Sequence, residues 1–208
     1  MSAPSPWPVI HAERAALADD LASLTDDQWS SPSLCPGWSV WETLGHMTAT
    51  AKMTPPKFFL KMLGTGFRFE SFAAKNIAAE TSRTPADTLA EFRRVATSTS
   101  APPGPVDSWL GETIVHAEDI RRPLGIAHTY PQDAVVRVAD FYKGSNLLIG
   151  AKSRIEGLTL RATDTAWTIG SGPEVSGPIL ALLLAMTGRS AALDELSGEG
   201  LATLRERG

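Results

Sequence analysis

The chain has 208 residues, of which 43% are apolar and 20% charged, and these values indicate one large water-soluble domain or one domain with a small appendage. Its net charge of −4 and its lack of a basic cluster argue against nucleic acid and anionic membranes as partners. The longest apolar stretch, 179–186, is too short to cross a bilayer.

In the first third of the chain, apolar spacing and capping-box residues predict a series of helices. Residues 8–24 carry apolar side chains at helical spacing, and a capping box formed by Thr25 and Gln28 opens a short turn after them. A Ser/Pro-rich loop follows. Ser39 and Glu42 then form a second capping box, which begins a helix over about 39–53.

The middle of the chain predicts further helices. A phenylalanine-rich stretch, 58–72, is interrupted by Gly64 and Gly66, which favours two short helices; we expect its aromatic side chains in the core rather than in a pocket. The next helices are expected from Thr84-Pro85 onward, from an Asp107 N-cap to about 123, and over 131–144; a loop of linker composition spans 97–105.

The pattern changes after about residue 150. Apolar and polar residues alternate over 158–163, which predicts a strand, and a second strand is expected through Trp167 and Ile169. A very apolar helix then begins near 176–178. We therefore predict a mainly α fold, with a helical bundle over 1–150 and a small α/β region over 151–208.

Two Glu-x3-His pairs stand out in a chain with four histidines: Glu42 with His46, and Glu112 with His116. A four-residue spacing places both side chains of a pair on one helical face, one turn apart. Two such faces can converge on one divalent cation, and a His/Glu/His set leaves a fourth position open, as in catalytic zinc sites. The pairs thus motivate a metal-site hypothesis.

The helix with Glu112 and His116 strengthens this hypothesis. At about 100° per residue, Glu112, His116 and Asp119 fall within roughly 60° of one another, among apolar neighbours that predict deep burial. A buried polar strip needs partners. A metal ion would provide one, and so would an arginine or a hydrogen-bond network.

Other interpretations of the same residues stay open. A Glu-x3-His pair is commonly a solvated surface pair. Glu42 already serves in the capping box, so we place it outside the ligand set. His11 and His128 lack matching partners and are expected to be exposed or capping residues. Cys35 precedes a helix N-terminus, which can lower a thiol pKa, but a packing role is favoured.

Three blocks of the sequence resemble the mycothiol-dependent maleylpyruvate isomerase family. The first runs from Trp29 through PSLCPGWSVWETLGHM at 32–47, the second is GETIVHAEDIRRPLG at 111–125, and the third extends from VSGP at 175–178 to TGR at 187–189. This family is a branch of the metal-dependent DinB-like four-helix bundles. The third region, about 58 residues, is shorter here than in better-known members.

The resemblance implies a ligand set and a chemistry. The metal ligands would be His46, Glu112 and His116, with zinc the expected cation and mycothiol the thiol cosubstrate. A coordinated thiol is deprotonated and becomes a nucleophile at neutral pH. That chemistry would serve isomerisation or thiol transfer on a small electrophile, and the sequence does not choose between them.

Two further residues are assigned supporting roles. Asp119 is placed to orient the His116 imidazole from one turn away. Among the arginines that would hold a substrate carboxylate, Arg189 is preferred because it lies in the third resembling block; the others are Arg83, Arg121 and Arg122.

The rival hypothesis is a non-catalytic bundle that keeps a metal for stability or binds an apolar ligand through the phenylalanine-rich stretch. A third possibility is a small-molecule carrier built around the α/β region. The N-terminus lacks a signal-peptide pattern and the single Cys35 precludes an internal disulfide, so a cytoplasmic location is expected. The substrate and the oligomeric state cannot be inferred from the sequence.

Overall fold

A computed structural model describes residues 4–147 and 149–208 of the chain. It divides into two compact units, Met1–Thr129 and Tyr130–Gly208, called here the N-terminal and C-terminal units. The sequence suggested a boundary near residue 150, whereas the contacts divide the chain after Thr129. The helix after this point packs against the apolar helix of the C-terminal unit, which accounts for its place there.

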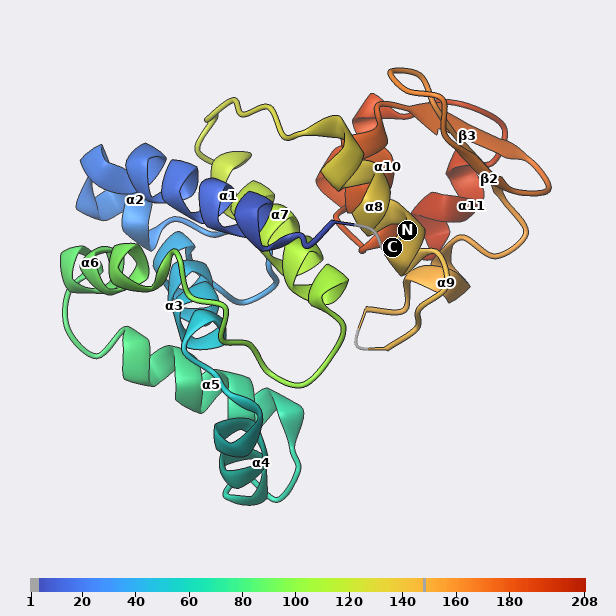
Figure 1. Cartoon of the computed structure of the whole chain (residues 1–208). Helices are drawn as coiled ribbons and strands as arrows, with labels where there is room; N and C mark the ends of the chain where they lie inside the picture. Colours follow the sequence, from blue (N-terminus) through green and yellow to red (C-terminus); the bar gives the residue numbers. More distant parts are fainter. Residues whose placement is uncertain (1–3, 148) are drawn as a thin grey trace. The chain divides into compact units, whose positions relative to one another are not determined.

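The N-terminal unit is a bundle of helices (Figure 1). Helix α3 packs against α5, α6 and α7, while α1 packs against α6 and α7. The bundle therefore has α3 and α7 as adjacent members, and the predicted mainly helical fold is confirmed. The helices are α1 (Trp7–Asp20), extended by a 3₁₀ turn (Leu21–Ser23), α2 (Asp26–Ser30), α3 (Val40–Ala51), α4 (Pro55–Leu63), α5 (Phe69–Glu80), α6 (Pro85–Val95) and α7 (Val106–Arg121).

Helix α3 begins where the sequence predicted. The Ser39 hydroxyl accepts the Glu42 backbone N–H, and the Glu42 carboxylate accepts the Ser39 N–H at 2.8 Å, so the capping box is complete. Leu44 and Met47 are fully buried on this helix. The cap and the core face together fix the rotation of α3, and with it the direction of His46.

Helix α7 begins differently from the prediction. Its N-cap is Pro105 and no side chain caps it, so the expected Asp107 cap is wrong; Asp107 lies inside the first turn instead. A carboxylate there still interacts favourably with the helix dipole. Almost every residue from Leu110 to Arg121 is buried, as the apolar surroundings of the polar strip predicted.

The phenylalanine-rich stretch forms two helices, as Gly64 and Gly66 predicted. Phe72 and the half-buried Phe58 pack with Met53 and Met62. The expectation that the whole stretch belongs to the core is wrong, because Phe59, Phe67 and Phe69 are exposed.

The C-terminal unit joins a small sheet to helices, and its α/β character is confirmed. The sheet order is β2-β1-β3, with β1 antiparallel to β2 and parallel to β3. Strand β3 was missed because Ser176-Gly177-Pro178 predicted the start of the following helix, which begins only at Ile179. Helix α10 is buried almost all round and packs against α8. The elements are α8 (Gln132–Tyr142), α9 (Ala151–Arg154), β1 (Thr159–Ala162), β2 (Thr168–Gly170), β3 (Glu174–Gly177), α10 (Ile179–Met186), a 3₁₀ helix (Ser190–Glu195) and α11 (Leu201–Glu206).

Gly170 at the end of β2 is required by its backbone. Its φ is +80°, and a Cβ added there would lie 2.1 Å from the Leu158 carbonyl oxygen. We expect Gly170→Ala to lower the local free energy of unfolding by more than the roughly 1–2 kcal/mol that left-handed strain alone costs, because the Leu158 carbonyl must also shift. Amide hydrogen exchange over 158–170 measures this. Gly144→Ala, with open space around the added Cβ, should leave that exchange unchanged.

Within the described residues, no helix has the length and apolarity that crossing a membrane requires.

Candidate metal centre

Helices α3 and α7 lie side by side and carry the predicted ligands (Figure 1). His46 projects from α3, and Glu112 and His116 come from α7. The His46 Nε2 lies 4.0 Å from the Glu112 Oε1, and the two imidazole rings have their centroids 4.9 Å apart. Residues separated by about 70 positions are thus brought within reach of one small ion.

The Glu112 carboxylate is the feature that fits a cation best. Its Oε1 is buried and has no hydrogen-bond partner among the residues that the structure describes, while its Oε2 is 3.5 Å from the Thr113 hydroxyl. A buried carboxylate oxygen without a partner is costly. Two imidazoles and a carboxylate are a donor set that Zn²⁺ and similar divalent ions accept. The residues present therefore fit the implied ion.

Asp119 forms a hydrogen bond with the Nδ1 atom of the His116 ring. The His116 Nδ1 donates to the Asp119 Oδ2 at 2.9 Å, and Asp119 is fully buried. Because Nδ1 is engaged by Asp119, Nε2 is the ring nitrogen that would bind an ion after losing its proton. A carboxylate that orients a ligand imidazole in this way is a recurrent feature of metal sites.

The two histidines differ strongly in charge preference. Burial and the neighbouring His116 lower the pKa of His46 to about 3, so His46 is neutral at pH 7 with a lone pair available. Burial also disfavours charge on His116, but its hydrogen bonds to Asp119 and Cys35 outweigh this and raise its pKa to about 10. In the metal-free site His116 carries the extra proton.

Burial raises the pKa of the Glu112 carboxyl, and the positive charges of His116 and Arg14 offset part of that rise. Arg14, on α1, is fully buried. Its Nη1 donates to the Ser98 carbonyl oxygen at 3.2 Å, but its Nε and Nη2 have no hydrogen-bond partner within the described part of the chain. Arg14 was not singled out from the sequence, because an isolated arginine on a helix carries no motif.

Cys35 takes part in the same network, although the sequence favoured a packing role. Its Sγ donates to the Asp119 Oδ2 at 3.0 Å and lies 3.4 Å from the His116 Nδ1. Trp38 lies beside both imidazoles, with ring centroids 5.0 Å from His46 and 6.3 Å from His116. The CPGW turn before α3 therefore supplies one wall of the site.

Cys35, His116 and Asp119 are themselves a possible metal-binding group, since one potential ligand atom of each lies within 4.8 Å of the others. Their separations of 2.9–3.4 Å are those of hydrogen bonds. In the part of the chain that the structure describes, no buried nitrogen or oxygen of this network lacks a hydrogen-bond partner in the way that the Glu112 Oε1 does. We therefore interpret it as the support behind His116.

Other predicted candidates have separate roles. Glu42 stays in its capping box. His128 pairs with Glu13 at 2.7 Å, and the His11 Nε2 lies 3.3 Å from the Ser98 oxygen. Of the arginines, Arg121 pairs with Asp20 and Arg122 with Glu118, whereas Arg83 lies near Asp87. Arg189 belongs to the C-terminal unit, where its Nη1 donates to the Thr187 oxygen.

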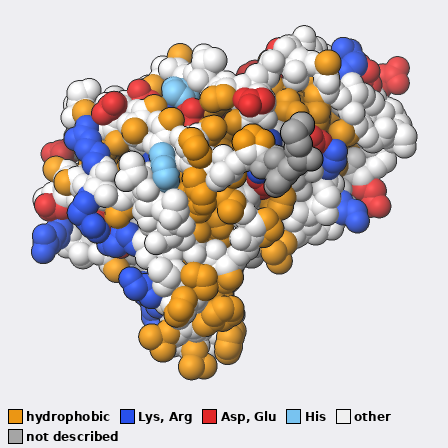
Figure 2. Space-filling model, in the orientation of Figure 1, with side chains coloured by type: hydrophobic (Ala, Val, Ile, Leu, Met, Phe, Trp, Pro, Cys, Tyr) orange, Lys and Arg blue, Asp and Glu red, His pale blue; other side chains and the backbone are white. Residues whose placement is uncertain are grey.

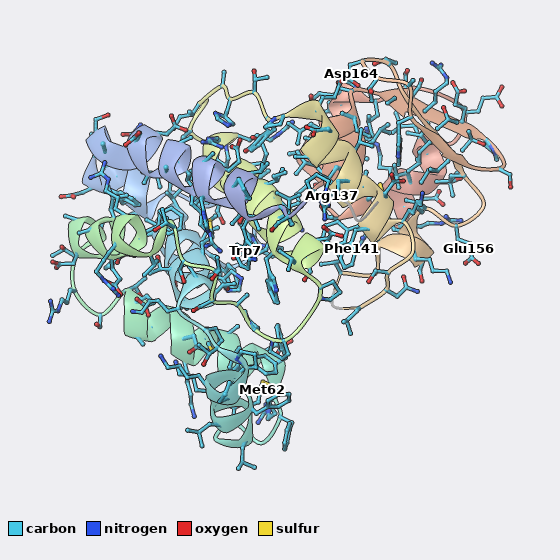
Figure 3. All side chains as sticks on the ribbon, viewed as in Figure 1. Trp7, Met62, Arg137, Phe141, Glu156 and Asp164 are labelled. Atoms are coloured by element: carbon cyan, nitrogen blue, oxygen red, sulfur yellow. The ribbon has the colours of Figure 1, made fainter. Side chains whose placement is uncertain are left out.

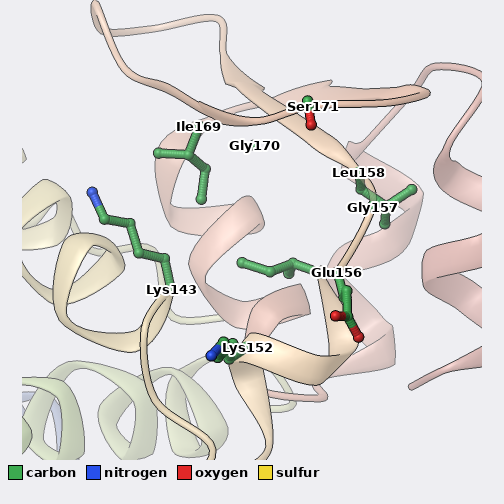
Figure 4. Close-up of a pocket in the computed structure, with 9 residues that line it drawn as sticks. Lys143, Lys152, Glu156, Gly157, Leu158, Ile169, Gly170 and Ser171 are labelled. Atoms are coloured by element: carbon green, nitrogen blue, oxygen red, sulfur yellow. The ribbon is translucent and has the colours of Figure 1, made fainter.

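The C-terminal unit has an open cavity of about 440 Å³ between the sheet and the α8–α9 region (Figure 4). None of its lining residues is a predicted ligand or catalytic residue. They are Lys143, Lys152, Ile155, Glu156, Gly157, Leu158, Ile169, Gly170 and Ser171.

Comparisons with known proteins identify the family and the fold of the chain. The sequence profile of the mycothiol maleylpyruvate isomerase N-terminal domain matches residues 10–136, more than half of the chain. The crystal structure of the mycothiol-dependent maleylpyruvate isomerase is similar, with a TM-score of 0.62 and 14% identity over 93% of this chain and 91% of that chain. Its histidine-to-alanine mutant has a TM-score of 0.59, the same identity and the same coverage.

At 14% identity these two structures show a shared fold. None of the curated protein sequences matches the chain. The profile match covers the loop with Cys35, all of α3 and all of α7, and so includes every residue of the candidate metal centre. The chain therefore belongs to the family defined by the mycothiol maleylpyruvate isomerase N-terminal domain.

Proposed function

We propose that the protein is a metal- and mycothiol-dependent isomerase or S-transferase acting on a small electrophile, as in maleylpyruvate isomerisation. The observation that carries the proposal is the buried Glu112 Oε1, which has no hydrogen-bond partner among the described residues and lies 4.0 Å from the His46 Nε2. When bound, a divalent ion such as Zn²⁺ supplies Lewis acidity that deprotonates a thiol at neutral pH.

The chain's own residues prepare this chemistry. His46, Glu112 and His116 would hold the ion, and a set of three protein ligands would leave a position for the thiol. Asp119 fixes the His116 ring, and Cys35 shares that carboxylate with it. The positive charge of Arg14 favours the ionised form of Glu112. Side-chain exposures of 22% for His46 and 16% for His116 leave the site partly open to solvent.

Arg189 is proposed to hold a carboxylate of the substrate. Its guanidinium suits a bidentate contact with a carboxylate. Arg189→Lys should retain cation binding and raise the KM for an acidic substrate more than that for an uncharged electrophile. Equal KM changes for both substrates would remove Arg189 from this role.

The decisive test of function is thiol-dependent turnover. The protein loaded with zinc is expected to consume maleylpyruvate or a generic electrophile only when mycothiol is present, and His46→Ala should abolish this. Stoichiometric cation binding without thiol-dependent turnover would favour the rival interpretation, a bundle that keeps its metal for stability.

Cation uptake is expected to release protons. At pH 8 the metal-free His116, with a pKa of about 10, carries a proton on each ring nitrogen, and coordination displaces one of them. Affinity should therefore increase with pH up to about 10. Titration calorimetry in buffers of different ionisation heat counts the protons. Heats that do not depend on the buffer at pH 8 would contradict this assignment.

A further inference from the structure

The described part of the chain exposes few large apolar side chains, and most of them lie together. Five occur between positions 59 and 69, on α4, the following turn and the start of α5; the sixth, Leu147, lies in the C-terminal unit. Figure 2 shows hydrophobic side chains gathered over the α4 end of the N-terminal unit, where Figure 3 labels Met62. We call this set the apolar knob: Phe59, Leu60, Leu63, Phe67 and Phe69, which are 42–71% exposed.

Helix α4 has three distinct faces. At about 100° per residue, Phe59, Leu60 and Leu63 fall within roughly 100° of one another and point to solvent. Phe58 and Met62 form the face that packs on Met53 and Phe72. Helix α4 therefore packs on the N-terminal unit through Phe58 and Met62 without the knob residues. Packing within this unit does not explain why the outer face of the helix is apolar.

The turn after α4 presents another aromatic ring to solvent. Phe67 has φ +59° and is 66% exposed. A bulky side chain is strained in the left-handed region of backbone conformation. An exposed phenylalanine recovers none of this through burial in the fold. A partner that buries the ring would offset the strain.

The charges within the knob segment are all positive, and the first acidic residue is the exposed Glu70, directly after Phe69. Between Thr54 and Phe69 the charged residues are Lys57, Lys61 and Arg68, with no acidic residue, although the whole chain carries −4. Lys57 and Lys61 lie together on α4, about 130° from the centre of the exposed apolar face. Both are exposed, and Lys61 donates to the Asn76 side chain. Our expectation of no membrane partner rested on the net charge, which conceals this local excess.

We propose that the apolar knob docks on an anionic lipid surface, with α4 lying in the headgroup layer. Aromatic and leucine side chains beside lysine and arginine are the composition of helices that lie in a membrane interface. A second copy of the chain is a poorer occupant, because a symmetric contact through the knob would bring the three cations of each copy together. The headgroup layer offers apolar burial and negative charge at once.

Cosedimentation with vesicles tests this proposal on the full chain. Vesicles of equimolar phosphatidylcholine and phosphatidylglycerol should bind the protein at low salt, whereas pure phosphatidylcholine vesicles should bind it far more weakly. The double variant Leu60→Asp/Leu63→Asp should lower the partition coefficient about 100-fold or more, given the area that two leucines bury. Replacing Lys57 and Arg68 by Gln should lower it about fivefold per cation on anionic vesicles.

Leu147→Asp is the matched control, since Leu147 is 78% exposed outside the knob and the substitution is the same. It should leave partitioning unchanged. Thiol-dependent turnover in lipid-free solution should be equal in all these variants, which separates this proposal from the proposed function. The lipid assignment would be overturned if the Leu60→Asp/Leu63→Asp variant bound anionic vesicles as well as the unmodified protein does. It would also be overturned if sedimentation velocity showed a dimer of the unmodified protein that this variant does not form.

Discussion

Glu112→Gln is expected to lower zinc affinity by roughly 100- to 1000-fold and to abolish thiol-dependent turnover. Structural zinc sites with four ligands bind with about 10–16 kcal/mol, or about 2.5–4 kcal/mol per ligand. The amide removes the negative charge of the buried Oε1 and leaves its size nearly unchanged, so the fold should survive. A competition titration against a chromophoric chelator measures the affinity, and His46→Ala should give a loss of the same order.

The chain contains a close control for this experiment. Glu42 has the same four-residue spacing to His46 that Glu112 has to His116, but its carboxylate caps α3. Glutamine also serves in a capping box, so Glu42→Gln should keep both the helix and the zinc affinity. His11→Ala is the corresponding control for His46→Ala. Equal losses for Glu42→Gln and Glu112→Gln would mean that the ligand assignment is wrong.

Asp119→Asn is expected to lower zinc affinity by about 10–100-fold, the usual effect of removing a carboxylate behind a ligand histidine. It should also lower the pKa of His116 in the metal-free protein from about 10 toward its ordinary value, because the hydrogen bond and charge of Asp119 raise it. NMR titration of the ring protons measures this second effect.

A purely structural role for Asp119 would give a different result. Loss of packing would lower stability without moving the His116 titration selectively. Asp107→Asn, on the first turn of the same helix, should change neither zinc affinity nor the His116 pKa. An unchanged His116 pKa in Asp119→Asn would contradict the positioning role.

The stability of the metal-free protein should depend on pH through the buried His46. His46 has a folded-state pKa of about 3, below its ordinary value of 6.5, so the unfolded chain binds the proton more strongly. The free energy of unfolding should therefore decrease as the pH falls from about 6.5 toward 3. His46→Gln should remove this part of the acid sensitivity in urea titrations.

The sequence predicted the proximity of the candidate ligands better than it predicted the residues around them. Helical spacing placed Glu112, His116 and Asp119 on one face, and the capping box fixed the start of α3, because both are local rules. Arg14 and Trp38 approach the site from α1 and from the turn before α3, so no local sequence pattern predicts their place beside it. Cys35 reaches Asp119 only through the tertiary contact between the CPGW turn and α7.

The errors in the fold have similar causes. The sequence placed Asp107 at the N-cap of α7, because aspartate is a favoured cap, whereas Pro105 occupies that position. Strand β3 was missed because Ser176 and Gly177 were assigned to the start of α10, and its parallel pairing with β1 is set by tertiary contacts. The knob was assigned to the core because aromatic burial is the usual outcome.

X-ray absorption at the zinc edge tests the central claim most directly. The zinc-loaded protein without thiol should show only nitrogen and oxygen neighbours at about 2.0–2.2 Å, and mycothiol should add one sulfur at about 2.3 Å. A sulfur neighbour already present before any thiol is added would place zinc on Cys35. That result would contradict a centre formed by His46, Glu112 and His116.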